Sequence, residues 1–172
     1  MLDKYKKLFE IAKYEYPSLY NEIVFIEKGK EFCVSSNIFT GDHIIYISEI
    51  NYNDKHTKWL NNYLFNNYNL DVNEHMYYNF NEVFAFFHEV GHIYYSHKKY
   101  NTENLYQNYK QKTYKNHEEA WEEYRQIPNE KEADEFAINI MKNNIYKIWS
   151  IMNDITEEQA KEEYNFWNIL ED

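Results

Sequence analysis

The segment from Asn81 to His97 constrains the fold most strongly, because it is apolar on nearly every side of a helix yet contains two histidines. A helix that is apolar all round is buried in the middle of a domain. His88 and His92 are four residues apart, so they lie only about 40° apart on the helix surface, one turn from each other. Two imidazoles in that phase can reach one tetrahedral metal ion. The segment therefore predicts a central helix that carries half of a metal site.

Glu89 follows the first histidine and points into the neighbouring sector of the same helix. A carboxylate there is close enough to take a proton from a water molecule on the metal, without joining the ligands. We therefore predict a zinc site with Glu89 as the general base. The alternative is a pair of hydrogen-bonded core histidines, in which the glutamate has no part.

Two other residues of this segment have distinct predicted roles. Gly91 costs the helix about 1 kcal/mol relative to alanine, which indicates that another segment packs closely against the backbone there. His97 projects about 180° from His88 on the helix. We therefore expect His97 to be a solvated residue at the helix end, and not a metal ligand.

Glu130 is the best candidate for the third ligand. The helix expected after Pro128 has one apolar stripe, made of Ala133, Phe136, Ala137, Ile140 and Met141. Glu130 and Asp134 fall within this stripe, whereas Glu132 falls on the opposite side. Burying two carboxylates is costly unless they meet a cation or a charged donor, so we predict Glu130 as a ligand and Asp134 as the hydrogen-bond acceptor of a ligand imidazole. The alternative is an acidic first turn favoured by the helix dipole.

The two motifs together resemble the ImmA/IrrE family of zinc metallopeptidases. Its members carry His-Glu-x-Gly-His followed by Glu-x-x-Ala-Asn/Asp-x-Phe-Ala, which match within Phe87–His97 and at Glu130–Ala137. The preceding segment, Asn79–Glu82, departs from the basic or threonine-containing stretch that is commoner in the family. The resemblance implies a gluzincin-like fold and, in many relatives, cleavage of a partner transcriptional regulator. Position by position, it implies zinc ligands at His88, His92 and Glu130, the base at Glu89, and small packing residues at Ala133 and Ala137.

The rest of the chain predicts one α+β domain over residues 1–172, with a small sheet of about three strands packed against the zincin-like motif helix and further helices. We expect an amphipathic helix at Leu2–Tyr16 and a hairpin formed by Glu22–Glu27 and Glu31–Ser35. A third strand at His43–Ser48 is expected to offer its edge to a substrate backbone.

The later elements follow from periodicity and punctuation. They are a helix around Trp59–Tyr68, the motif helix from about Asn81 to Lys98, a loop or lid at Lys99–Tyr114, a short acidic helix at His117–Gln126, a helix from Asn129 to about Lys147, and a final helix to Leu170 opened by a capping box at Thr156–Gln159. A group that stabilises a developing oxyanion remains open among Tyr106, Tyr109, Tyr114, His117 and Tyr124.

Charge and cysteine content bear on partners and location. The chain has 29 acidic and 18 basic residues, a net charge of −11, which repels phosphate backbones and argues against direct nucleic-acid binding. This charge suits a basic protein partner such as a DNA-binding repressor, or alternatively it only keeps a tyrosine-rich surface soluble. Cys33 is the single cysteine, and no segment reads as a membrane span or signal peptide, so we expect the cytoplasm of a prokaryotic cell.

The expected function is therefore that of a zinc-dependent metalloendopeptidase acting on a protein partner, a transcriptional repressor or regulator. Three alternatives stay open: a zinc-binding regulator that binds its partner without cleaving it, a peptidase toxin with a broad cellular target, and a metal-free structural domain.

Overall fold

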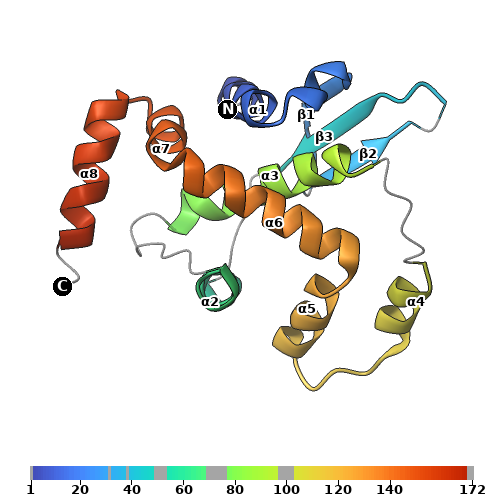
Figure 1. Cartoon of the computed structure of the whole chain (residues 1–172). Coiled ribbons are helices and arrows are strands. Elements are labelled where there is room, and N and C mark those ends of the chain that lie inside the picture. Colours follow the sequence, from blue (N-terminus) through green and yellow to red (C-terminus); the bar gives the residue numbers. More distant parts are fainter. Residues whose placement is uncertain are drawn as a thin grey trace.

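The computed structural model describes residues 2–30, 32–37, 39–48, 54–68, 77–96 and 103–169 (Figure 1). These residues form helices and one small mixed sheet, so the predicted α+β class is confirmed. The elements in chain order are α1 (Leu2–Glu15), the 3-10 helix η1 (Pro17–Asn21), β1 (Val24–Lys28), β2 (Cys33–Ser36), β3 (His43–Ile47), α2 (Asp54–Tyr68), α3 (Tyr77–Tyr94), α4 (Glu103–Gln111), α5 (His117–Arg125), α6 (Pro128–Asn143), α7 (Ile145–Asn153) and α8 (Glu157–Ile169).

The strand order is β1-β3-β2, so the predicted hairpin between the first two strands is wrong. β1 runs parallel to β3, with Val24 opposite His43, and β2 runs antiparallel to β3. The third strand takes the centre because Ile45 and Ile47 are fully buried, whereas Phe25 of β1 is 50% exposed. Both sides of β3 are thus paired within the sheet. It cannot offer an edge to a substrate, which also corrects that prediction.

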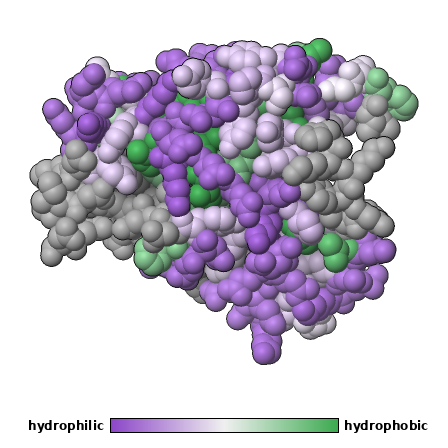
Figure 2. All heavy atoms as spheres, in the orientation of Figure 1, coloured by the Kyte–Doolittle hydropathy of each residue, from purple (hydrophilic) through white to green (hydrophobic). Residues whose placement is uncertain are grey.

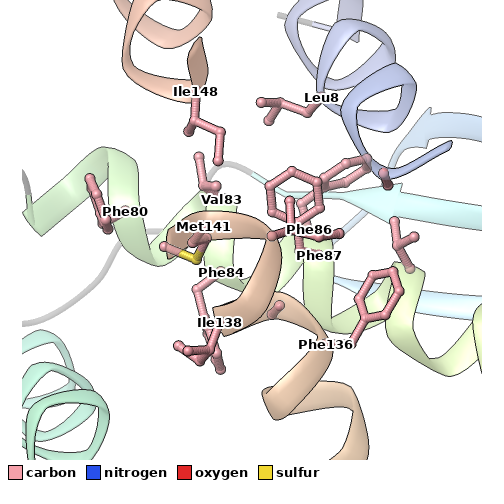
Figure 3. Packing of buried hydrophobic residues seen from close by; sticks show 14 of the residues in the cluster. Leu8, Phe80, Val83, Phe84, Phe86, Phe87, Phe136, Ile138, Met141 and Ile148 are labelled. Atoms are coloured by element: carbon pink, nitrogen blue, oxygen red, sulfur yellow. The ribbon is translucent and has the colours of Figure 1, made fainter. Parts of the chain in front are cut away.

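Helix α3 lies at the centre of the molecule, as the apolar segment predicts. Figure 3 shows Leu8 of α1, Met141 of α6 and Ile148 of α7 gathered around Val83 and Phe86 of α3. Its most extensive helix partner is α6, which crosses it in Figure 1. The two helices that carry the predicted ligands are therefore packed directly on each other.

The structure corrects two predictions about the helices. The segment predicted as a loop at Lys99–Tyr114 contains α4, and its first four residues lie outside the described part of the chain. The helix predicted to reach Lys147 ends at Asn143, because Asn144 turns the chain and its amide donates to Ile140 O (3.1 Å) and Glu15 Oε1 (3.2 Å). This turn lets α7 start on a new axis.

The capping box before α8 is confirmed by a reciprocal pair of hydrogen bonds. Gln159 N donates to Thr156 Oγ1 (3.2 Å), and Thr156 N donates to Gln159 Oε1 (3.0 Å). Leu170, the predicted end of that helix, and His97 both lie outside the described residues.

The face shown in Figure 2 is mainly hydrophilic, with small hydrophobic areas between polar side chains. This matches a chain in which acidic residues outnumber basic ones, 29 to 18. Among the residues that the structure describes, none of the helices is long and apolar enough to cross a bilayer.

Helices α3 and α6 approach each other closely at Gly91, as the glycine in this helix predicts. A Cβ added there would lie 2.9 Å from Ala133 Cα, 3.2 Å from Ala133 O and 3.2 Å from Phe136 Cβ. Backbone atoms cannot move aside as a flexible side chain can. Gly91 and Ala133 therefore let the two helices approach closely enough for their polar residues to meet.

We predict that Gly91→Ala lowers the free energy of unfolding by about 1–3 kcal/mol, although alanine favours the helix. The added methyl group must push α6 away from α3, so zinc affinity should fall as well. Urea unfolding and zinc titration measure the two effects. Gly41→Ala is the control, because Gly41 has φ +76° and open space around its Cβ position. It should lose stability through backbone strain alone, and equal zinc losses in both variants would contradict this prediction.

Candidate metal centre

Helices α3 and α6 bring the three predicted ligands to one point. His88 Nε2 lies 3.0 Å from His92 Nε2 and 3.2 Å from Glu130 Oε2. His92 Nε2 lies 3.6 Å from the same carboxylate oxygen. A tetrahedral ion with bonds of about 2.0–2.1 Å needs ligand atoms about 3.3 Å apart, and the three distances bracket that value. This buried His-His-Glu group could therefore hold a metal ion.

His92 is the most exposed of the three side chains in the ligand group. His88 and Glu130 keep 8% and 3% of their side-chain surface exposed, whereas His92 keeps 20%. Glu89 and Glu132 are half-buried and stay outside the ligand group formed by the described residues, as their helical phases predict. A metal ion held here would be reached past His92.

Asp134 holds His88 from behind, as predicted. Its Oδ1 accepts a hydrogen bond from His88 Nδ1 at 2.8 Å, and its Oδ2 accepts one from the Tyr63 hydroxyl at 2.9 Å. Because Nδ1 carries the hydrogen, the lone pair of neutral His88 lies on Nε2, the atom that faces His92 and Glu130. The carboxylate thus selects the tautomer that a metal ion requires.

Arg125 is a site residue that the sequence reasoning missed. Its guanidinium pairs with Asp134 Oδ1 and lies over the Phe84 ring, 5.4 Å from the centroid. It supplies the charged donor that a fully buried Asp134 needs. A signal for it was present, since Arg125 is the only arginine in the chain. A single arginine among many lysines points to a place that needs a planar guanidinium.

Tyr106 and Tyr124 are the two oxyanion candidates that reach the ligand group. The Tyr106 hydroxyl donates to Glu130 Oε1. Burial and the nearby Glu130 carboxylate raise the pKa of Tyr124 well above its ordinary value. For the other three candidates, Tyr114 donates to Tyr109 O (3.2 Å), the Tyr109 ring packs on the rings of Tyr114 and Tyr124, and the His117 ring packs on Trp121.

A proton occupies the ligand group in the metal-free protein. Burial by itself lowers the pKa of His88, but its hydrogen bonds to Asp134 and Glu130 outweigh that and raise the pKa to about 9. Burial likewise raises the pKa of Glu130, but the hydrogen bonds from His88 and His92 outweigh it and hold the pKa well below its usual range. Protonated His88 therefore faces ionised Glu130, and a metal ion must displace the proton on Nε2.

We predict that zinc affinity rises with pH up to about 9, by roughly tenfold per pH unit for one displaced proton. The folding stability of the metal-free protein should change in the opposite direction and fall as pH rises. Because the pKa of His88 is raised on folding, its contribution to stability is complete below about pH 6.5 and is lost as pH rises through about 9. Competition against a chelator and calorimetry in two buffers measure affinity and proton release. An affinity that is flat from pH 9 down to pH 5 would exclude histidine ligation.

Two imidazole nitrogens and one carboxylate oxygen converge in the ligand group. The half-buried carboxylate of Glu89 lies near Tyr106. After burial and Glu130, it is a further cause of the raised pKa of the Tyr106 hydroxyl. Three protein ligands leave a fourth position of a tetrahedral ion open, which is the pattern of catalytic rather than structural sites. Comparison with known proteins finds no family model, no curated protein and no solved structure that matches this chain.

Proposed function

We propose that this protein is a zinc metallopeptidase that hydrolyses a peptide bond in a protein partner. One observation carries the proposal: Glu130 Oε2 meets Nε2 of His88 and His92, while Glu89 stays outside the ligand group on the same helix. Two imidazoles with one carboxylate suit zinc, and the spacing of the atoms fits its bond lengths. The resemblance of both motifs to the ImmA/IrrE family supports the same reading.

Each residue of the site has a defined part in the proposed reaction. When bound, zinc supplies a Lewis acid that lowers the pKa of water and polarises the scissile carbonyl. Glu89 accepts the proton of the attacking water and delivers it to the leaving amine. Asp134 keeps the hydrogen of His88 on Nδ1, and Arg125 neutralises Asp134 by pairing with the same oxygen, Oδ1. Helices α3 and α6 pack closely at Gly91, and this packing keeps Glu130 within reach of α3.

The substrate we propose is a basic protein, with a DNA-binding repressor as the leading class. The net charge of −11 attracts basic partners and repels nucleic acid. Regulator cleavage is also what the family resemblance implies. The chain would thus act on a protein that binds DNA, without binding DNA itself.

The direct test incubates the zinc-loaded protein with purified DNA-binding repressors of the same organism, one at a time. The protein should cut its partner among them at one site, and a chelator should stop the cut. Mass spectrometry of the products identifies the new termini. Many new termini across the proteome of expressing cells would favour a broad toxin. If the zinc-loaded protein binds its partner at saturation but does not cut it, this result would favour the alternative that the protein is a zinc-binding regulator without peptidase activity.

A further inference from the structure

The two oxygens of Glu130 face different partners. Oε2 lies 3.2 Å from His88 Nε2 and 3.6 Å from His92 Nε2. Oε1 instead accepts a hydrogen bond from the Tyr106 hydroxyl, with Asn129 Nδ2 at 3.4 Å. Only one of the two oxygens is therefore directed at the point where a metal ion fits.

The hydrogen of the Tyr106 hydroxyl has one direction open to it. Asn129 Nδ2 donates to that hydroxyl oxygen at 2.7 Å, which occupies a lone pair and leaves the hydroxyl hydrogen for Glu130. The amide orientation is consistent, because Nδ2 also faces the carboxylate. Tyr106 is thus the donor to Oε1.

A carboxylate can bind a metal ion through one oxygen or through both. If Oε1 turned toward the ion, it would take the position that a catalytic site needs for water and substrate. The hydrogen bond from Tyr106 opposes that turn, because Oε1 would lose its donor inside a largely buried group. The oxygen that could close the site is therefore already engaged.

We infer that Tyr106 is a positioning residue that keeps Glu130 a one-oxygen ligand and so keeps the open coordination position free. The inference rests on the proposed metal centre and adds a determinant of its coordination number. It assigns a function to α4, whose packing onto the site is otherwise slight. The open coordination position would then depend on one hydroxyl group, which comes from a helix outside both sequence motifs.

The test compares cobalt-substituted variants, because the visible absorption of Co²⁺ weakens as its ligands increase from four to five. Tyr106→Phe keeps the ring and its packing on Tyr124 but removes the donor. We expect this variant to bind Co²⁺ but to show weaker visible absorption per bound cobalt than the wild type. Acetohydroxamate, a probe that needs the open position, should bind roughly 10- to 100-fold more weakly. Tyr109→Phe is the matched control on the same helix, and it should keep the wild-type spectrum and affinity.

Two further measurements keep the test decisive. Asn129→Ala removes the donor that orients the hydroxyl, so its spectrum should shift part of the way toward that of Tyr106→Phe. If circular dichroism shows that Tyr106→Phe does not fold, the cobalt spectrum and acetohydroxamate affinity of Asn129→Ala test the inference in its place. Wild-type absorption and acetohydroxamate affinity in a folded Tyr106→Phe would overturn the inference alone. A wild-type protein that takes up neither Co²⁺ nor Zn²⁺ would instead refute the metal centre and the proposed function with it.

Discussion

Glu89→Gln should reduce cleavage of the partner by roughly 10²- to 10⁴-fold while zinc content and fold stay unchanged. Glutamine keeps the size and much of the hydrogen bonding of glutamate but cannot accept the proton of water. Glu89 lies outside the ligand group, so its replacement removes no bond to the metal. Rates of product formation, metal analysis and circular dichroism give the three quantities.

The matched control for this variant is Glu82→Gln. Glu82 lies on the same face of α3, two turns earlier, where its carboxylate accepts a hydrogen bond from the Tyr5 hydroxyl at 3.2 Å. It should retain full cleavage, because it serves packing with α1 and not the site. Glu89→Gln should still bind the partner and can trap it for identification. If Glu89→Gln reproduces the whole cellular effect of the wild type, proteolysis is not the function.

Removal of any single ligand should strip the metal. His88→Ala, His92→Ala and Glu130→Ala each leave two protein ligands, too few for a catalytic zinc site. The wild type should bind about one zinc per chain, and its unfolding should shift with zinc by about 2.7 kcal/mol at a hundredfold excess over the dissociation constant. In the three variants this stabilisation should disappear. Metal content after dialysis and denaturant titration with and without zinc measure both effects.

Glu132→Ala and His97→Ala are the controls for the ligand set. Glu132 lies on the same helix as Glu130 but outside the ligand group. His97 is predicted to be solvated and lies outside the described residues. Both variants should keep their zinc. Loss of metal in Glu132→Ala with retention in Glu130→Ala would reverse the assignment of the third ligand.

Much of the candidate site could be predicted from helical phase. The spacing of His88 and His92 determines that they share one face of α3, and Glu130 and Asp134 are the acids that fall in the apolar stripe of α6. Gly91 indicated a close helix contact, and the contact with Ala133 confirms it. These features are local, since a helix relates residues three or four apart by a known rotation.

Other features depend on which segments meet in space. Nothing within β1 and β2 shows that β3 lies between them, because strand order is decided by which strand buries its side chains best against the helices. Tyr106 is one of nineteen tyrosines, and only the packing of α4 near α6 singles it out.

Arg125 and Asp134 lie nine residues apart on two different helices, α5 and α6. The chain between them turns at Pro128, so helical phase does not relate them. Amino-acid sequence by itself determined which side chains share a helix face and which of them are too polar for the core without partners. The tertiary structure decided which residues serve as those partners, because a buried charge is satisfied by the donor that the fold places beside it.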